Sequence, residues 1–256
     1  MTLKSAIIAI SIVFLGSGCL PVKTLTGSNN AIPGKTGWQA AGTGVFRYEC
    51  APPACAARIV IYRFPKAGFS WRFQNSAAPL TVEGHLASDP NAVFAVNGVY
   101  FDEKFAPAGW MISGGKTIGD KKYEYSKSAI LELAPEFKII DTAKEKFAAK
   151  NIAEAAQSYP LLIADGAVQN VANEKTARRT FAGTDKQGNA YFGIIPDDDV
   201  TLAGSAELIN GLGVDWNNVL NLDGGPSSGL VSNLPESKEE LNSIVQVPNA
   251  ILAEIK

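Results

Sequence analysis

Short runs of β-branched, aromatic and other apolar residues, separated by turn residues, recur along most of the chain. Runs of this length and composition predict β-strands. The clearest of them occupy residues 57–64, 69–73, 93–96, 129–133 and 137–140. A hairpin is predicted over 181–195 with its turn at 185–189, and a last strand over 243–255 that is interrupted at Pro248.

Helix signals are fewer. Thr142–Glu145 and Asn151–Glu154 each place a capping residue three positions before a glutamate, which is typical of a helix N-terminus. Residues 201–210 predict a further helix. Strand runs followed by helices, without regular alternation, predict an α+β fold. We expect a single domain with a mixed, largely antiparallel β-sheet and a few flanking helices.

The N-terminus carries an export signal. The apolar run Ala6–Leu15 is ten residues long, which is too short to span a bilayer but typical of a signal peptide. Small residues and Cys19 follow, and this pattern resembles the bacterial lipoprotein signal, in which cleavage leaves a lipidated cysteine. A plain secretory signal is the alternative, because Leu15 lies four rather than three positions before the cysteine. Both interpretations assign residues 1–18 to a signal peptide.

The next segment lacks the features of a folded domain. Residues 20–43 are rich in Gly, Ser, Asn, Thr and Pro and show no sustained apolar period. We therefore expect a lipidated N-terminus and flexible tether over 19–43, and one folded domain over 44–256. The predicted location is the bacterial cell envelope, either lipid-anchored, with the N-terminal lipid holding the protein on the membrane, or periplasmic.

Cysteine spacing agrees with export. Cys50 and Cys55 flank Ala-Pro-Pro-Ala, a loop short enough to be closed by a disulfide in an oxidising compartment. A two-cysteine metal site is the alternative interpretation.

Composition narrows the function further. Of 256 residues, 46% are hydrophobic and 19% charged, which predicts a folded domain with its own core. The net charge is -2 and no Lys/Arg cluster stands out, so we expect no nucleic-acid partner. The only histidine, His85, excludes a three-histidine zinc site and is interpreted as a structural residue in a short helix. The acidic run 197–199 suits a helix N-terminus or a hard cation.

Three polar segments interrupt or end apolar runs and hold the candidate chemistry. Phe94–Asp102 contains an amide, a glycine and a carboxylate; Ala177–Gly183 contains paired arginines; Val219–Gly229 contains a carboxylate, two glycines and two hydroxyls. Each alone also fits a turn or a solvated strand edge. Together they supply two carboxylates, a guanidinium and a glycine-rich loop, which are the parts of a sugar-phosphate site.

The third segment carries a family resemblance. Asn221–Ser228 reads Asn-Leu-Asp-Gly-Gly-Pro-Ser-Ser. It closely resembles the Asn-Leu-Asp-Gly-Gly-Gly-Ser-Ser/Thr signature of the phosphodiester glycosidase family, which includes the mannose 6-phosphate uncovering enzyme. Further segments are similar to this family in the same order: 97–102, 109–115, 159–166, Arg179-Thr180 with Gly183, and 247–249. The similarity covers nearly all of residues 44–256.

The resemblance implies a hydrolase that cleaves a sugar-1-phosphodiester in envelope or extracellular glycans, with a sugar-phosphate or polysaccharide substrate. No cofactor is expected, and a divalent cation is left open. Arg179 suits a bidentate contact with the phosphate. Asp223 would stabilise the oxocarbenium-like centre or activate water, with Asp102 as the second carboxylate. The residues expected to bind sugar or phosphate are Asn97, Gly98, Thr180, Gly224, Gly225, Ser227 and Ser228.

Two positions depart from the family pattern. Val99 replaces a usual glycine, and Pro226, which has no N–H, replaces the third glycine of the signature. If that N–H binds phosphate in relatives, the substrate is altered or activity is lost. The alternatives to an enzyme are therefore a non-catalytic glycan-binding envelope lipoprotein on the same fold and a purely structural envelope protein.

Overall fold

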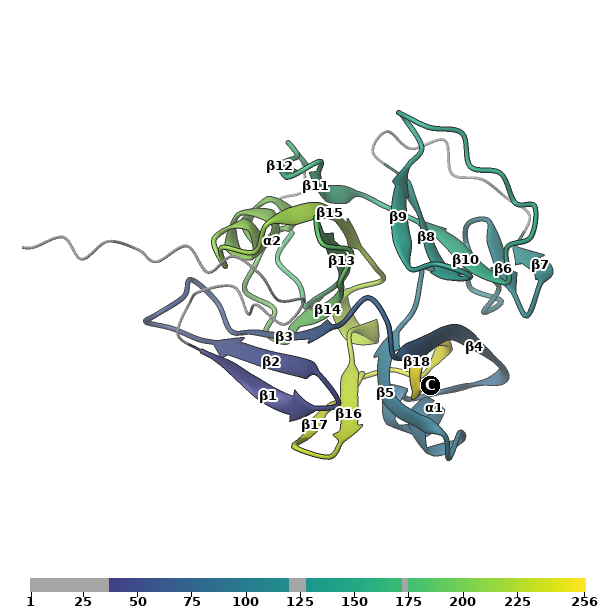
Figure 1. Cartoon of the computed structure of the whole chain (residues 1–256), viewed down its shortest axis with the longest axis horizontal. Coiled ribbons are helices and arrows are strands. Elements are labelled where there is room, and N and C mark those ends of the chain that lie inside the picture. Colours follow the sequence, from purple (N-terminus) through teal and green to yellow (C-terminus); the bar gives the residue numbers. More distant parts are fainter. Residues whose placement is uncertain (1–36, 120–127, 172–174) are drawn as a thin grey trace, which may run out of the picture.

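Strands dominate the structure. The computed structural model describes residues 37–119, 128–171 and 175–256, and in these residues the strands form three antiparallel sheets (Figure 1). Two short α-helices accompany them in the described residues: α1 (Val82–Ala87) and α2 (Leu202–Asn210). The fold is therefore a single, largely antiparallel β-domain. It is compatible with the predicted α+β class, but it contains less helix than the sequence predicts.

The largest sheet has eight strands in the order β1-β2-β3-β14-β13-β15-β11-β12, and every neighbouring pair is antiparallel. Its strands are β1 (Trp38–Gly42), β2 (Val45–Cys50), β3 (Ile59–Phe64), β14 (Ala190–Ile195), β13 (Arg179–Asp185), β15 (Trp216–Asn221), β11 (Leu161–Ala164) and β12 (Ala167–Val168).

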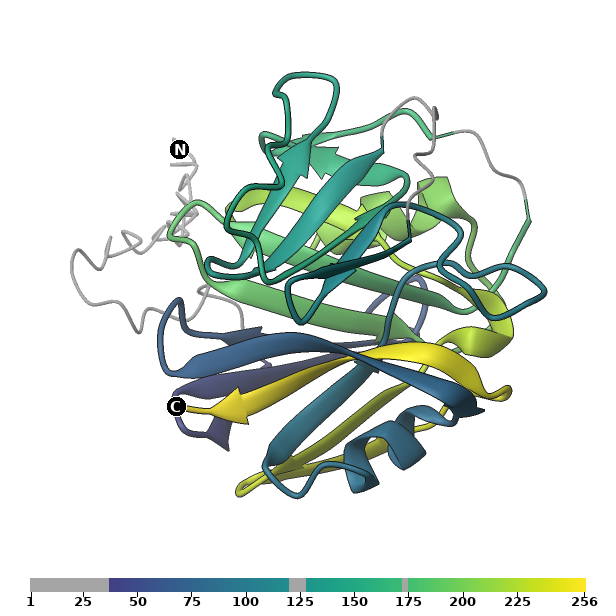
Figure 2. The same cartoon turned by 90° about the vertical axis from the view of Figure 1, so that its right-hand side faces the viewer.

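Two five-stranded sheets pack beside it. One has the order β17-β16-β5-β18-β4 and the other β7-β6-β10-β8-β9. The first comprises β17 (Ser237–Leu241), β16 (Leu230–Leu234), β5 (Ala92–Asn97), β18 (Val247–Ile255) and β4 (Phe69–Leu80). The second comprises β7 (Lys116–Gly119), β6 (Met111–Ser113), β10 (Glu154–Ser158), β8 (Ala129–Ala134) and β9 (Lys138–Asp141). Figure 2 shows β4 and β18 crossing the molecule below the green strands of the largest sheet.

The central strands of the eight-stranded sheet are buried on both faces. Side chains alternate along β14, so Phe192 faces the main core between the sheets and Tyr191 faces a second core beneath α2. An aromatic cluster centres the main core, where the Phe64 and Trp71 rings meet edge to face at 4.8 Å. Burial of both faces explains why β14 is a continuous apolar run and why β3 is apolar except at Arg63, rather than alternating.

The predicted helix at 201–210 is confirmed, because the Thr201 hydroxyl accepts a hydrogen bond from Gly204 N at 3.0 Å and caps α2. The hairpin over 181–195 is also confirmed, as β13 and β14. Pro248 lies near the start of β18, beside a register shift, so it displaces the strand pairing without ending the strand.

Two helix predictions are wrong. Residues 142–145 form a turn, in which the Thr142 hydroxyl donates to Ser128 O at 2.8 Å rather than capping a helix. The second predicted helix is replaced by β10 (Glu154–Ser158), because pairing with β6 and β8 overrides the capping pattern that begins at Asn151. The Glu154 carboxylate accepts hydrogen bonds from the backbone amides of Phe73 and Gly114, so it is not available to close a capping box.

The folded region begins inside the predicted tether. Trp38 opens β1, pairs with Tyr48 of β2 and packs against its ring at 5.4 Å between centroids. The tether predicted over 19–43 therefore extends too far toward the domain. The predictions for residues 1–18 and Cys19 lie outside the described residues. Neither described helix has the length and apolarity that crossing a bilayer requires.

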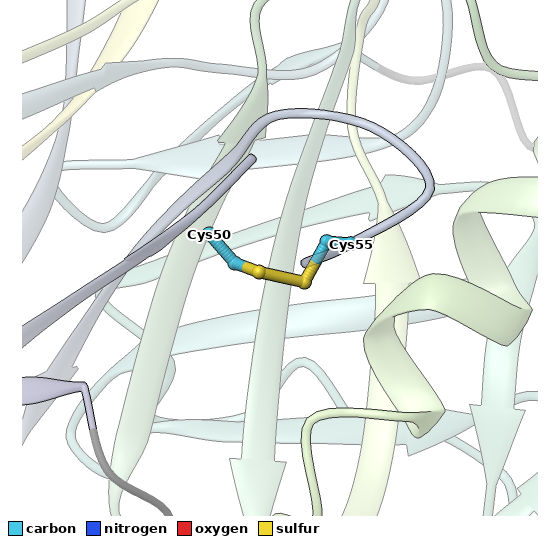
Figure 3. Close-up of a disulfide and its surroundings, with 2 residues drawn as sticks. All are labelled: Cys50 and Cys55. Atoms are coloured by element: carbon cyan, nitrogen blue, oxygen red, sulfur yellow. A yellow bond between two sulfur atoms is a disulfide. The ribbon is translucent and has the colours of Figure 1, made fainter. Parts of the chain in front are cut away.

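A disulfide joins Cys50, the last residue of β2, to Cys55 in the loop before β3 (Figure 3). This is the pairing expected from the short Ala-Pro-Pro-Ala loop, and it replaces the alternative of a two-cysteine metal site. The disulfide holds the turn between two neighbouring strands.

His85 is fully buried in α1, where Nε2 donates to Val247 O at 2.9 Å and fastens the helix to β18. Burial lowers the pKa of His85, and the hydrogen bond to Val247 opposes this only in part. The unfolded chain therefore binds this proton more readily than the folded chain. The stability that neutral His85 supports is present above the unfolded pKa of about 6.5 and is lost as the pH falls below it.

We predict that His85→Gln, which keeps a donor but does not titrate, shows a smaller loss of unfolding free energy than wild type between about pH 7.5 and about pH 5. Urea titrations at the two pH values measure the difference. Equal losses in both proteins would show that His85 does not sense acid.

Candidate active site

The site is built where β5 and β15 end and β13 begins. The turn after β15 lies between the two other segments, because Asp223 N donates to Gly98 O at 3.3 Å and Gly225 N donates to Arg178 O at 2.8 Å. The fold therefore brings together the three polar segments that the sequence separates by up to about 130 positions.

Asn97 joins these segments through one side chain. It is fully buried, and its Oδ1 accepts from the Thr180 hydroxyl at 2.8 Å and from Gly229 N at 3.1 Å. Its Nδ2 donates to Asp223 O at 2.8 Å and to Gly98 O at 3.3 Å. Both ends of the amide are thus engaged within the protein, and a sugar or phosphate contacting Asn97 would compete with these bonds.

Asn249 of β18 was not among the site residues predicted from the sequence. Its Oδ1 accepts from Val99 N at 2.8 Å, its Nδ2 donates to Val99 O at 3.3 Å, and its backbone oxygen accepts from Gly98 N at 3.1 Å. A Cβ on Gly98 would lie 1.9 Å from Asn249 Oδ1, so only glycine allows this approach. The Val99 side chain is 2% exposed and packs in the main core. The departure at Val99 is therefore accommodated by packing.

Asp223 carries the carboxylate of the turn. It is half-buried, its Oδ1 accepts from Gly224 N at 2.8 Å, and the Ser227 hydroxyl also hydrogen-bonds to the carboxylate. Burial raises the pKa of Asp223, while these two hydrogen bonds oppose the rise. The carboxylate is therefore more basic than one in water, which suits proton transfer.

Pro226 fits the turn in which it lies. Residues Gly225–Ser227 form a single turn of 3-10 helix with Pro226 in its first positions, where backbone amides have no partner within the helix. Gly225 has a φ of +59°, which glycine adopts without strain. The missing N–H thus disrupts no hydrogen bond of the turn.

Arg178 and Arg179 are both buried, at 8% and 7% exposure. Arg179 donates to Lys175 O at 2.6 Å and to Val200 O at 3.4 Å, and Arg178 Nη2 donates to Asn242 O at 3.1 Å. Burial lowers the pKa of both guanidinium groups, which still remain charged.

In the described residues no carboxylate contacts either guanidinium directly, although the charge of Asp198 acts on both arginines from nearby. Within the described chain, neither guanidinium forms an ion pair with a carboxylate, and the buried Arg178 Nε has no partner. Buried positive charge beside the Asp223 turn suits an anion such as a phosphate. The sequence had assigned this role to Arg179 alone.

Two more buried polar atoms lack partners at this turn: Asn221 Oδ1 and Ser228 Oγ. The Asn221 Nδ2 group donates to the Tyr100 hydroxyl at 2.7 Å and to Tyr159 O at 3.2 Å, which fixes the orientation of the amide. An unpaired acceptor and a hydroxyl are suited to the hydroxyl groups and phosphate oxygens of a ligand. Asn221 and Tyr100 were not predicted as site residues, although both lie in the motifs that carry the resemblance.

Asp102 has a local role in the structure. Its carboxylate is exposed, and Oδ1 accepts from Lys104 N at 2.8 Å and Ala106 N at 3.0 Å, so it shapes its own loop. None of the hydrogen bonds or ion pairs of the described residues joins Asp102 to Asp223 or Arg179. The geometry therefore places Arg179 and Asp223 on adjoining segments and gives Asp102 no direct contact with either.

In the described part of the chain, no group of three or more His, Cys, Asp or Glu side chains lies close enough together to hold a metal ion. In the acidic run 197–199, Asp198 Oδ1 accepts from Arg178 N at 2.8 Å and thus supports the start of β13.

Comparison with known proteins identifies the family. A family model described as phosphodiester glycosidase matches residues 90–254, which include all three polar segments. The chain belongs to the phosphodiester glycosidase family. This confirms the resemblance carried by the sequence motifs. No curated protein matches the chain in sequence.

Solved structures share the fold at low identity. The catalytic domain of zebrafish N-acetylglucosamine-1-phosphodiester alpha-N-acetylglucosaminidase, auto-inhibited by its pro-peptide, is 15% identical with a TM-score of 0.58, covering 83% of this chain and 82% of that one. A hypothetical protein from Synechocystis is 16% identical with a TM-score of 0.54, covering 83% and 62%. A Burkholderia pseudomallei protein assigned as exported is 12% identical with a TM-score of 0.52, covering 80% and 75%.

The Asn97 network predicts a large effect of mutation. Asn97→Ala leaves the buried Thr180 hydroxyl and two backbone groups of the turn without partners, so we expect a loss of about 2–4 kcal/mol in unfolding free energy. Asn233→Ala, on the exposed face of β16, is the matched control and should change it by less than about 0.5 kcal/mol. Urea denaturation measures both, and a similar small effect of the two variants would contradict the role of Asn97 as a clamp.

Proposed function

We propose that the chain is a hydrolase that cleaves a sugar-1-phosphodiester between the anomeric carbon and the phosphate oxygen. The observation that carries this proposal is that the turn after β15 holds a half-buried carboxylate of raised pKa, Asp223, and bonds through Gly225 N to Arg178 O. Arg178 and Arg179 are both buried, and neither forms an ion pair with a carboxylate of the described residues. A carboxylate beside an anion-binding site is the arrangement such a reaction needs.

The reaction assigns a role to each group. Water attacks the anomeric carbon, the bond from that carbon to the phosphate oxygen breaks, and a phosphomonoester leaves with the bonding electrons. The Asp223 carboxylate accepts the proton of the attacking water or stabilises the oxocarbenium-like centre. Arg179, with Arg178, stabilises the negative charge that builds on the phosphate. Phosphate is a weakly basic leaving group, so protonating it matters less than in an ordinary glycoside.

The remaining predicted residues complete the proposal. Ser227 adjusts the basicity of Asp223, and the unpaired Ser228 hydroxyl binds the sugar or phosphate. Asp102 is kept as the candidate second carboxylate, since its exposed side chain lies on a loop that begins at Tyr100, a contact of Asn221. The other expected ligand contacts are those of Gly98, Thr180, Gly224 and Gly225.

Export to the cell envelope, with Cys19 as a lipid anchor, is part of the same proposal. It is supported by the apolar run before Cys19 and by the similar Burkholderia protein, which is assigned as exported. The zebrafish relative acts on an N-acetylglucosamine-1-phosphodiester, so this sugar is the first to test.

A non-catalytic glycan-binding protein is the second candidate. The observation that favours it is the isolation of Asp102, because glycosidases generally use a pair of carboxylates that flank the scissile bond. Such a protein would bind the same phosphodiesters without turnover.

A coupled assay distinguishes the two candidates. Cleavage of a sugar-1-(p-nitrophenyl phosphate) at the anomeric carbon releases p-nitrophenyl phosphate, which turns yellow only after a phosphatase is added. In a separate reaction in ¹⁸O-labelled water without phosphatase, the released p-nitrophenyl phosphate should carry no label, because the oxygen of water is added to the sugar. Binding of the ester without product, or label in the phosphate, would contradict the proposed hydrolysis.

We predict that Asp223→Asn lowers turnover on the order of 100-fold or more, since the amide cannot take a proton. It should also raise unfolding free energy relative to wild type near neutral pH, because the folded chain no longer holds a charge that burial disfavours. This gain should vanish below the unfolded pKa of about 3.9, where both states of wild type are neutral. Wild-type turnover, or a gain that does not depend on pH, would contradict the assignment.

Arg179→Ala should lower kcat/KM on the order of 100-fold through loss of charge stabilisation. The matched control is Arg58→Ala, which removes a part-exposed ion pair with Glu49 in the eight-stranded sheet and should leave kinetics unchanged. Circular dichroism and steady-state kinetics on both variants test this, and equal rates for the two would remove Arg179 from the site.

A further inference from the structure

Large apolar side chains are exposed at few places, and they concentrate beside the proposed active site. Those of the described residues are Phe105, Ile118, Ile244, Val245 and Ile255. Phe105 lies on the loop that follows β5, and Ile244 and Val245 lie on the loop that precedes β18. Both loops border the Asp223 turn, whereas Ile118 and Ile255 lie on β7 and at the end of β18.

The loop before β18 rests directly on the turn. Ile244 N and Val245 N both donate to Pro226 O, at 2.8 and 3.2 Å, while Arg178 Nη2 donates to Asn242 O. The two side chains are nevertheless 68% and 40% exposed. In Figure 2, this loop and the turn after β15 lie together at the right-hand edge.

The loop after β5 supplies an aromatic neighbour. Phe105 is 48% exposed and stacks on Phe101 with 5.9 Å between ring centroids. Phe101 in turn packs against the apolar cluster that contains Val82 and Val247. Val247 follows Ile244 by three residues in the sequence. Both loops therefore leave the same end of the β5–β18 pair, where the polar site also lies.

The chemistry of these side chains indicates what they contact. A phosphodiester substrate has a sugar on one side of the phosphate and an alcohol on the other. Branched aliphatic side chains form no hydrogen bonds with sugar hydroxyls, but they gain free energy by removing alkyl groups from water. Exposed apolar groups clustered at the rim of a polar site are typical of a binding surface. Because Ile244 N and Val245 N bond to Pro226 O of the Asp223 turn, one ligand bound at this turn can also contact these side chains.

We propose that Phe105, Pro226, Ile244 and Val245 form an apolar subsite for the alcohol of the substrate, and that this alcohol is a long-chain aliphatic or isoprenoid lipid. This inference rests on the proposed function and names its substrate class: sugar-1-phosphate esters of lipid alcohols. The same side chains could instead insert into the surface of a lipid bilayer, and the experiment below distinguishes this from binding of the substrate's alcohol.

The experiment compares two esters of one sugar 1-phosphate, a methyl and an octyl ester, with octyl kept below its micellar concentration and no lipid added. N-acetylglucosamine is the first sugar, and the sugar accepted in the coupled assay replaces it if different. The full chain should hydrolyse the octyl ester with a kcat/KM at least tenfold higher. In Ile244→Ser/Val245→Ser this ratio should fall toward one. Ile255→Ser, which changes an isoleucine 45% exposed at the end of β18 and away from the loops, should keep the wild-type ratio.

A ratio near one in wild type, or an unchanged ratio in the double variant, would overturn the subsite. Co-sedimentation with phosphatidylglycerol vesicles identifies the bilayer alternative, which is indicated by Ile244- and Val245-dependent vesicle binding without preference for the octyl ester. If no ester is hydrolysed, the proposed function fails, and the subsite is tested by binding of octyl phosphate against methyl phosphate. Tighter octyl phosphate binding that is lost in the double variant would then still support it, and equal binding would overturn it.

Discussion

The buried side-chain amide of Asn97 is the interaction on which the site depends. It lies at the end of β5, yet three of its four hydrogen bonds reach the start of β13 and both sides of the turn after β15, and the fourth holds the adjoining Gly98. Each of these groups would be costly to bury without a partner. The amide therefore fixes the position of three chain segments from two different sheets. Asn249 secures the same point from β18, so that the backbone around Gly98 has one arrangement.

The hydrogen bonds of Asn97 and Asn249 hold in place a turn with buried charged groups nearby, and burial of these groups costs unfolding free energy. Asp223 is half-buried with a raised pKa, and two arginines near its turn are buried without a direct ion pair in the described residues, although Asp198 lies near both. Burial of unpaired charge lowers stability, so such a cluster persists where the surrounding hydrogen bonds determine its geometry. The same conditions raise the basicity of a carboxylate and strengthen the attraction for a phosphate. The buried charges lower the stability of the folded chain, and the same burial makes them suited to an anionic ligand.

The sequence was most informative where local pattern and tertiary packing agree. The central strands of the eight-stranded sheet are buried on both faces, so β14 is an unbroken apolar run and β3 is interrupted only at Arg63. The sequence misled where a local signal was overridden: Glu154 follows a capping residue, but its carboxylate bonds to backbone amides of β4 and of the β6–β7 turn. The share of helix was overestimated for the same reason, because capping residues also serve in turns and sheets.

By itself the sequence determined the family, the β-rich character, and the residue types of the site, since motifs such as Asn221–Ser228 record which chemical groups must be present. Only the tertiary structure decided which of them meet. It joined the Asp223 turn to the segment that begins β13, through Gly225 N and Arg178 O, and it engaged the Asn97 amide in hydrogen bonds within the protein. It also placed Asp102 in a loop that its own carboxylate shapes. The physical reason is that convergence depends on strand pairing across distant positions and on burial, neither of which is encoded in the spacing of a motif.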